Sequence, residues 1–214
     1  MPETSASTVR IPALIRNEPV QARSTARLAA LLDAAAQVVD EIGYERLTTA
    51  MVADRAGASI GTVYRYFPDR IAVLQSLAAR NEERISALVL AEIREGDYAT
   101  WTDAMAGVFA LYVEAFRTEP GFASLRLGDV LDLRPAEGTP QNSVLADRMF
   151  DALVARFGVD DTEAARFAFD AGYELTDALV ARAFARDAQG DARYLDQARS
   201  TLRGIAAKEF ATTS

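Results

Sequence analysis

Hydroxyl and cationic side chains gather in one short stretch of the sequence, residues 48–70. If its second half is helical, one side of that helix is polar and carries Ser59, Gly61, Thr62, Tyr64, Arg65 and Tyr66. The residues near the helix start are small, so that another molecule's backbone could approach closely, and most of the others are hydrogen-bond donors. Such a face suits DNA, whose phosphates and base edges accept hydrogen bonds.

A plain helical hairpin within a helical core is the alternative for this stretch, because short helix pairs are common. Solvation alone would more often place Glu and Lys on such a surface, whereas this one carries tyrosines and two arginines, Arg65 and Arg70. The side-chain chemistry favours DNA binding without excluding the hairpin.

Two short helices are expected to position this face. Thr48 or Thr49 supplies a hydroxyl N-cap for the first helix, and Ser59 can cap the second. Gly57 between them allows the positive φ that a tight interhelical turn requires. Pro68 ends the second helix, because proline disfavours helical geometry in the residue before it. The apolar stripe that would hold the second helix to a core consists of Ile60, Val63 and Phe67.

Apolar residues recur at helical spacing along most of the remaining chain, which predicts an all-α fold. The longer helices are expected over about residues 24–43, 69–95, 101–118 and 142–157. Two more follow, one that starts at Thr162 with Glu163 and a final one with apolar residues from Tyr194 to Phe210, and Gly190-Asp191 separates them. Residues 1–22 contain three prolines among Ser, Thr and Arg, and we expect a flexible N-terminal arm there. Such an arm could follow a phosphate backbone or enter a minor groove, or it could simply be a disordered terminus.

Composition argues against catalysis. The 214 residues include no cysteine and no histidine, which removes thiolate chemistry, the commonest general base and the commonest metal ligand. Adjacent acidic pairs such as Asp160-Asp161 fit helix caps and solvated surface better than a catalytic pair. We therefore expect no enzyme, no cofactor and no metal site.

Targeting signals are also lacking in the sequence. No apolar run approaches the ~20 residues of a membrane span, and the first residues lack the apolar core of a secretory signal. We therefore expect a cytoplasmic protein without membrane association.

The charge distribution bears on DNA binding. A net charge of −8 argues against a generic nucleic-acid binder. However, residues 1–70 carry eight Arg and eight Asp or Glu, so the whole acidic surplus lies in residues 71–214. The candidate DNA-binding part is therefore neutral, although an uneven solvated surface explains the imbalance equally well.

The motif in this region resembles the N-terminal domain of tetracycline-repressor-type (TetR-family) regulators. The residues that carry the resemblance are Gly43-Tyr44, Leu47-Thr48-Thr49, Val52-Ala53, AGASIGTVYRYF at 56–67, and Asp69-Arg70. It extends without a gap over about residues 24–75, and Gly-Thr-Val-Tyr-x-Tyr-Phe after an Ala-Gly turn is specific in combination. The resemblance implies a helix-turn-helix domain at 23–70, joined by a long, rigid helix to a helical effector-binding and dimerisation domain at 71–214.

Phosphate contacts follow from the resemblance at four positions. Thr49 would hold a phosphate through its hydroxyl and backbone amide, and Arg70 would make a charged contact. Tyr64 and Tyr66 would donate their hydroxyl groups to phosphates.

Base reading is implied for the same helix. Ser59, Gly61 and Thr62 would lie at the edge of the major groove. Arg65 occupies a position that varies in the family and is the sharpest candidate to read a base, since arginine binds guanine through two hydrogen bonds. Ile60 stands where some relatives carry a polar residue, so hydrogen-bonded readout is not expected there.

The resemblance also implies an effector cavity in the second domain. Aromatic and methionine side chains could line it, although ordinary core is the more frequent role for any single one. The candidates are Trp101, Met105, Phe109, Tyr112, Phe116, Phe122, Met149, Phe150 and Tyr173, with Arg126 and Asp129 as polar groups that could orient a ligand.

The last two expected helices carry alanine-rich stripes that allow close packing, either with each other or across two protomers. TetR-family relatives dimerise through these helices. The expected function is a homodimeric transcriptional repressor that a largely apolar small molecule releases from a palindromic operator. The alternative is a DNA-binding regulator that responds to a protein partner or acts constitutively. An enclosed aromatic pocket would favour the first, and a fully packed second domain the alternative.

Overall fold

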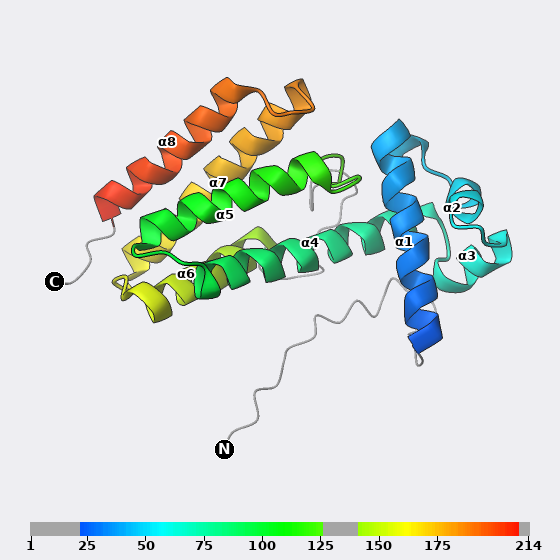
Figure 1. Cartoon of the computed structure of the whole chain (residues 1–214), viewed down its shortest axis with the longest axis horizontal. Helices are drawn as coiled ribbons and strands as arrows, with labels where there is room; N and C mark the ends of the chain where they lie inside the picture. Colours follow the sequence, from blue (N-terminus) through cyan, green and yellow to red (C-terminus); the bar gives the residue numbers. More distant parts are fainter. Residues whose placement is uncertain (1–21, 126–140, 210–214) are drawn as a thin grey trace, which may run out of the picture. The chain divides into compact units, whose positions relative to one another are not determined.

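The computed structural model describes residues 22–125 and 141–209, and every regular element in these ranges is a helix (Figure 1). The chain divides into two compact units. Of the described residues, 22–83 and 120–125 belong to the first unit, and 84–119 and 141–209 to the second. The all-α prediction is confirmed, with a helix-turn-helix near the N-terminus and a helical C-terminal domain. The expected N-terminal arm lies outside the described residues, except for its last residue.

The first unit contains α1 (Ala22–Ile42), a 3-10 turn η1 (Tyr44–Arg46), α2 (Thr49–Arg55), α3 (Ile60–Tyr66) and the start of α4 (Arg70–Glu95). One cluster of apolar side chains joins these elements. Its fully buried members include Leu31, Val39, Leu47, Val52, Val63, Phe67, Leu74 and Leu77. Because each such side chain contributes roughly 1.5–3 kcal/mol on burial, this core holds α3 firmly by one face.

The start of α4 belongs to this core. We expected a domain boundary at residue 70, whereas the chain passes from the first compact unit to the second after Glu83. The physical reason is that Val73, Leu74 and Leu77 are fully buried in the first unit's core.

Side-chain caps fix where the helices of the first unit begin. Thr48 Oγ1 accepts the Met51 amide at 3.2 Å, and Ser59 Oγ accepts the Thr62 amide at 3.1 Å. Asp69 Oδ1 caps α4 in the same way at 2.9 Å. The caps predicted at Ser59 and at Thr48 or Thr49 are therefore confirmed, and Thr48 is the residue that caps α2. Replacing a cap of this kind by alanine typically costs about 1 kcal/mol.

The turn between α2 and α3 requires a glycine. Gly57 has φ +58°, in the left-handed region. Its amide donates to the Asp54 carbonyl at 3.1 Å, and the Ala58 amide reaches back to the Ala53 carbonyl at 2.9 Å. These two bonds form a Schellman motif, which satisfies the last carbonyls of α2 and sets the direction in which α3 leaves. The prediction for Gly57 is confirmed.

The second unit contains the rest of α4, α5 (Trp101–Thr118), α6 (Gln141–Phe157), α7 (Glu163–Arg186) and α8 (Ala192–Glu209). Thr100 caps α5 through the Asp103 amide, and Thr162 caps α7 through the Ala165 amide. Helices α7 and α8 run side by side over most of their length (Figure 1). The predicted bounds of α5 and the predicted start of α7 at Thr162 with Glu163 are confirmed.

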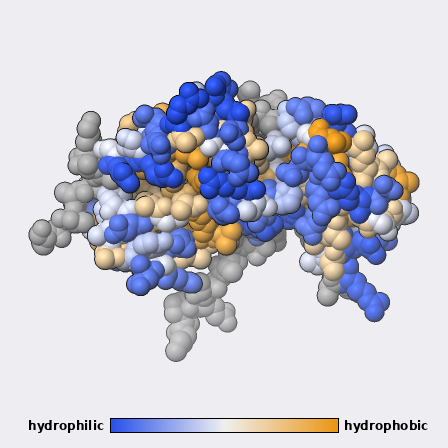
Figure 2. All heavy atoms as spheres, turned by 45° about the horizontal axis from the view of Figure 1, so that its top comes forward, coloured by the Kyte–Doolittle hydropathy of each residue, from blue (hydrophilic) through white to orange (hydrophobic). Residues whose placement is uncertain are grey.

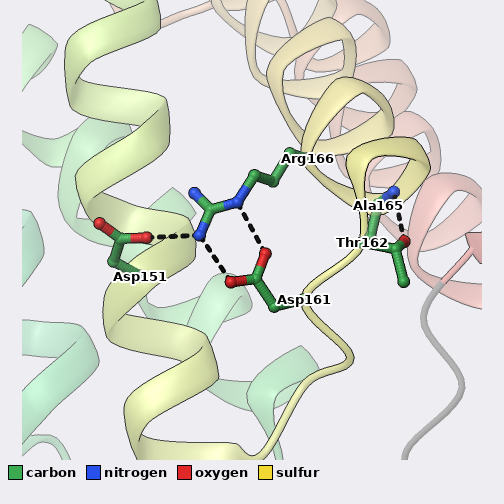
Figure 3. A network of polar contacts seen from close by, with 5 residues as sticks. All are labelled: Asp151, Asp161, Thr162, Ala165 and Arg166. Atoms are coloured by element: carbon green, nitrogen blue, oxygen red, sulfur yellow. Dashed lines mark hydrogen bonds and ion pairs between the residues drawn. The ribbon is translucent and has the colours of Figure 1, made fainter.

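Arg166 fastens the beginning of α7 to α6 (Figure 3). Its Nη2 donates to Asp151 Oδ1 on α6 at 2.8 Å, and its Nε donates to Asp161 Oδ1 at 2.7 Å. The guanidinium also lies 5.0 Å from the centroid of the Phe150 ring. The hydrogen bond from Arg166, the largest effect, lowers the pKa of Asp161 below its ordinary value. The same pairing raises the pKa of Arg166.

Candidate nucleic-acid interface and effector cavity

The outward face of α3 carries most of the polar residues predicted to contact DNA. Ser59, Gly61, Tyr64 and Arg65 are exposed, and Thr62 is half-buried. Ser59 Oγ lies 2.9 Å from Thr62 Oγ1, so the cap also orients the Thr62 hydroxyl. These side chains therefore project from a helix whose opposite side is buried in the core.

Gly61 keeps this surface open. A Cβ built at Gly61 would meet only Ser59 Oγ, at 3.8 Å, so the fold of the first unit does not require glycine there. Glycine inside a helix costs roughly 0.5–1 kcal/mol relative to alanine. Gly61 therefore lowers helix stability although no neighbouring atom requires a glycine there. This is consistent with the close approach of another molecule to the helix surface.

Tyr66 does not belong to the exposed face, and the expectation that it does is wrong. Only 3% of Tyr66 is exposed, and its hydroxyl lies 3.1 Å from Ser24 Oγ at the start of α1. The reason is helical periodicity: Tyr66 follows Val63 by three positions and lies beside Phe67, so it shares their buried stripe. Arg65 lies next to it, with its guanidinium 5.4 Å from the centroid of the Tyr66 ring.

Ile60 is the opposite case. It was predicted to lie in the buried stripe of α3, but it is 43% exposed. Ile60 is the first residue of α3, and the buried part of the helix begins one turn later at Val63. The outward face of α3 therefore includes one large aliphatic side chain among its polar groups.

The residues predicted to hold phosphates lie at helix starts and on α3. Thr49 is the first residue of α2, and its Oγ1 donates to the Tyr64 hydroxyl at 3.3 Å. This contact brings two of the predicted phosphate ligands together. Arg70 is the first residue of α4, is exposed, and donates from Nη1 to the Glu45 carbonyl at 2.7 Å.

An ion pair that the sequence analysis missed connects α1 and α2. Both guanidinium Nη atoms of Arg55 donate to the Glu41 carboxylate, at 2.9 and 2.6 Å. This hydrogen bonding lowers the pKa of Glu41 and raises that of Arg55. Bidentate geometry restrains orientation, so the pair helps to fix α2, which carries Thr49.

The second unit contains a partly open cavity of about 510 Å³, within the range of small-molecule sites. All five of the unit's helical segments contribute to its wall, from Ile85 and Val89 on α4 to Leu202 on α8. Six residues predicted as effector contacts line it: Trp101, Met105, Phe109, Tyr112, Met149 and Tyr173.

Three other candidates are absent from the wall formed by the described residues: Phe116, Phe122 and Phe150. Phe116 is buried and stacks on Phe184, with 4.8 Å between ring centroids. Phe150 is 1% exposed and meets Phe169 edge-on. Phe116 and Phe150 are therefore core side chains of the second unit. Phe122 belongs to the first unit. The polar candidates Arg126 and Asp129 lie outside the described residues.

Two buried polar residues of the cavity were missed by the sequence analysis. Thr176 and Asp177 are neighbours on α7 and are 7% and 6% exposed. The Tyr112 hydroxyl donates to Asp177 Oδ1 at 2.5 Å. Thr176 Oγ1 is buried and has no hydrogen-bond partner within residues 22–125 and 141–209. A signal was available, because a carboxylate within the apolar run LTDALV needs a specific partner.

Cationic side chains of the cavity lie on its exposed side. Arg199 and Arg203 on α8 both line it and are exposed. Arg199 pairs with Asp196 at 2.8 Å, and its guanidinium lies 5.3 Å from the centroid of the Phe109 ring. The exposed Asp103 on α5 also lines the cavity, so its solvent side carries charges of both signs.

Other kinds of site receive no support from the part of the chain that the structure describes. It contains no group of three or more side chains placed to hold a metal ion. None of its helices is both long enough and apolar enough to cross a membrane.

Two protein-family models match the sequence. The model described as bacterial regulatory proteins of the tetR family matches residues 31–77, which include α2 and α3. The model described as the tetracyclin repressor-like C-terminal domain matches residues 99–208, just over half of the 214 residues. The chain belongs to the TetR family. It is a DNA-binding transcriptional regulator, and membership points to a transcription factor rather than an enzyme.

Individual relatives agree with this assignment. A TetR-family transcriptional regulator from Streptomyces coelicolor is 32% identical with a TM-score of 0.69, and the match covers 86% of this TetR-family chain and 97% of that one. A TetR-family regulator from Pectobacterium atrosepticum has a TM-score of 0.68 over 91% of this chain and 99% of that one. At 16% identity it shows the shared fold alone.

The curated relatives align over a shorter part of the chain. The HTH-type transcriptional repressor KstR from Mycolicibacterium smegmatis is 42% identical over 57 residues, 27% of this chain and 28% of the relative. The TetR-family chain therefore spans little more than a quarter of that repressor's length.

Proposed function

We propose that this TetR-family regulator is a homodimeric repressor that leaves a palindromic operator when a small molecule binds its second unit. The observation that carries the proposal is the cavity of about 510 Å³ lined by Trp101, Phe109, Tyr112 and Tyr173. A regulator that responds only to a protein partner, or acts constitutively, would need no such cavity. The KstR relative is itself named a transcriptional repressor.

In this proposal α3 enters the major groove. Thr49, Tyr64 and Arg70 hold phosphates on either side of it, and these contacts set affinity and register rather than sequence preference. Arg65 reads a guanine, with Thr62 beside it at the groove edge. In the dimer the two copies of α3 lie about 34–36 Å apart and read successive major grooves.

The surface of α7 supports the proposed dimer. Phe167 and Leu175 are 74% and 56% exposed, and their spacing of eight residues places them on one side of the helix. The smaller Ala171 lies between them. Figure 2 shows apolar residues, in orange and tan, interrupting the hydrophilic surface of the molecule. Burial of two large side chains in each protomer would contribute several kcal/mol at roughly 1.5–3 kcal/mol each.

Helix α4 is the proposed connection between DNA binding by the first unit and effector binding by the second. One part of it places Leu74 and Leu77 in the core of the first unit, and a later part places Ile85 and Val89 in the cavity wall. An effector that binds more tightly to the conformation unable to hold DNA shifts the population away from the operator. Reciprocity then requires operator DNA to weaken effector binding by the same factor.

A single exposed substitution tests the dimer. Phe167→Glu should convert the protein to monomers in sedimentation-velocity runs and reduce affinity for a two-site operator, because it places a charge in the proposed interface. Leu88→Glu is the matched control, since Leu88 on α4 is 47% exposed and lies away from α7 in sequence. A dimer that survives Phe167→Glu at micromolar concentration would contradict the proposed interface.

A further inference from the structure

We propose that Ile60 contributes to sequence preference by packing against the C5 methyl group of a thymine in the major groove. The inference rests on the proposed entry of α3 into that groove. It adds a second means of reading a base, beside the arginine contact proposed at Arg65. It follows from an aliphatic side chain that stays outside the core of the first unit.

Ile60 does not take part in the core. It is 43% exposed, whereas Val63 and Tyr66 in the following turn are 0% and 3% exposed. Partly buried apolar side chains such as Leu28 and Ile42 pack against the core of the first unit, and among the described residues Ile60 does not. Single exposed aliphatic residues are common on protein surfaces, so exposure alone assigns no role. The position of Ile60 on α3 is the more specific observation.

Ile60 is the first residue of the helix that is proposed to enter the major groove. In helix-turn-helix proteins the first residues of this helix contact base edges. The sequence neighbours of Ile60 leave it uncovered, because Ser59 and Thr62 are small and a Cβ built at Gly61 would meet only Ser59 Oγ, at 3.8 Å. No larger side chain beside Ile60 would therefore hold this end of α3 away from a base pair.

The chemistry of the side chain selects thymine. Ile60, Gly61 and Thr62 are all uncharged, so the start of α3 offers an apolar group without a neighbouring charge in the same turn. Among the base edges in the major groove, only thymine presents an apolar group, its C5 methyl. The isoleucine side chain makes no hydrogen bond, so this methyl is the base-edge group that it can recognise. Contact removes water from both apolar groups, which is favourable.

The stiffness and placement of the side chain favour such a contact. β-branching leaves essentially one χ1 rotamer for isoleucine in a helix, so little conformational freedom is lost on binding. Tyr64 lies one turn later on the same side of α3 and is 44% exposed. Thr49 Oγ1 donates to its hydroxyl at 3.3 Å, and both residues are proposed to hold a phosphate. Phosphate contacts there would fix the side of α3 that carries Ile60 against the DNA.

Uracil in place of thymine tests the contact, because uracil lacks the C5 methyl group and keeps every hydrogen-bonding group of the base edge. The probe is the duplex that the full-length protein enriches from random DNA, remade with uracil at one thymine position of each half-site at a time. We expect one position at which uracil weakens binding about fourfold for each half-site, the effect of burying one methyl group. If no position responds, or if the enriched half-site contains no thymine, the inference is overturned.

Variants assign the effect to Ile60. Ile60→Ala shortens the side chain to its Cβ, and we expect a stable fold because Ile60 is exposed and alanine favours helix. It should bind the thymine duplex about fourfold more weakly for each half-site and lose its response to uracil, because the methyl group has lost its partner. Ile60→Val keeps the branched Cβ and should retain most of the response.

Leu88→Ala is the matched control. Leu88 is a 47% exposed aliphatic residue on α4 in the second unit, and this variant should respond to uracil as the wild type does. Circular dichroism confirms that each variant is folded before affinities are compared by fluorescence anisotropy. Equal sensitivity to uracil in Ile60→Ala and in the wild type would refute the assignment.

The outcomes separate this inference from the proposed function. If a repeated sequence is enriched and uracil weakens binding at no position, α3 still reads DNA and only the methyl contact fails. If Ile60→Ala weakens the thymine and uracil duplexes by the same factor, Ile60 contacts the sugar-phosphate backbone and does not read a base. If no sequence is enriched, DNA reading by α3 fails, and the inference fails with it.

Discussion

Replacing Tyr66 by phenylalanine should destabilise the first unit while leaving its affinity for DNA nearly unchanged. The ring is 97% buried and would stay buried as phenylalanine, so the substitution removes only the contacts of the hydroxyl with Ser24. The hydroxyl lies 3.1 Å from Ser24 Oγ and makes a long hydrogen bond of 3.5 Å to the Ser24 carbonyl. A hydrogen bond of this kind contributes about 0.5–1.5 kcal/mol net, and the Ser24 hydroxyl at the surface can bond to water instead. We therefore expect a loss of about 1 kcal/mol in the free energy of unfolding.

The neighbouring Tyr64 provides the matched comparison. It is 44% exposed, and its hydroxyl receives only a long hydrogen bond of 3.3 Å from Thr49. Tyr64→Phe should therefore change the free energy of unfolding by less than about 0.5 kcal/mol. If its hydroxyl binds a phosphate, the loss of a hydrogen bond to a charged group should weaken operator binding by about 1.5–3 kcal/mol per protomer.

Both quantities are measurable on the same samples. Urea unfolding followed by circular dichroism, with hydrogen exchange of the α1–α3 amides, gives the stability of the first unit. Fluorescence anisotropy with labelled operator gives affinity, and the salt slope should not change in either variant because tyrosine is uncharged. If Tyr66→Phe lost as much DNA affinity as Tyr64→Phe at unchanged stability, the Tyr66 hydroxyl would face DNA, and the reasoning from burial would be wrong.

Three further predictions concern arginines. Arg65→Ala should weaken operator binding by about 1–3 kcal/mol and relax preference at one base pair; equal losses on operator and random DNA would restrict Arg65 to phosphate contact. Arg70→Ala should weaken binding to all sequences and lower the salt slope by about one, and an unchanged slope would contradict its phosphate role. Arg166 lowers the pKa of Asp161, so its stabilisation is present above the unfolded pKa and lost as pH falls. Acid titration of Arg166→Met should therefore show a shallower loss of stability below about pH 4 than the wild type, and parallel curves would exclude this contribution.

Local signals explain which parts of the fold were predictable from sequence. Thr48, Ser59 and Thr162 cap helices by accepting an amide three residues ahead, and Gly57 adopts a backbone geometry that side chains disfavour. These effects depend on neighbours in the chain, so the sequence alone reveals them. The bounds of α5 followed in the same way from the spacing of its apolar residues.

Tertiary packing explains the errors on α3. Periodicity cannot distinguish whether a short helix is buried along Ile60 and Val63 or along Val63 and Tyr66, because both pairs are three residues apart. The outcome depends on where the core of the first unit ends, and that is set by α1, which receives the Tyr66 hydroxyl at Ser24. Burial, rather than residue type, therefore separates Tyr64 from Tyr66.

The cavity was predictable on one wall. Residues Trp101, Met105, Phe109 and Tyr112 recur at steps of three and four on α5, and all of them line it. Choosing every aromatic and methionine residue as a cavity candidate also selected Phe116 and Phe150, which are core residues. Residue type does not reveal which side of a helix faces a cavity. Asp177 was missed, although an acidic residue in an apolar run is a sequence signal that such a search can include.

Selection of bound sequences from a pool of random DNA shows whether the protein recognises a palindromic operator as a dimer. We expect enrichment of an inverted repeat, with half-site centres about one helical turn or a multiple of it apart. A pool without any enriched sequence would contradict sequence-specific DNA binding by α3, and enrichment of a single, non-repeated site would contradict the dimer.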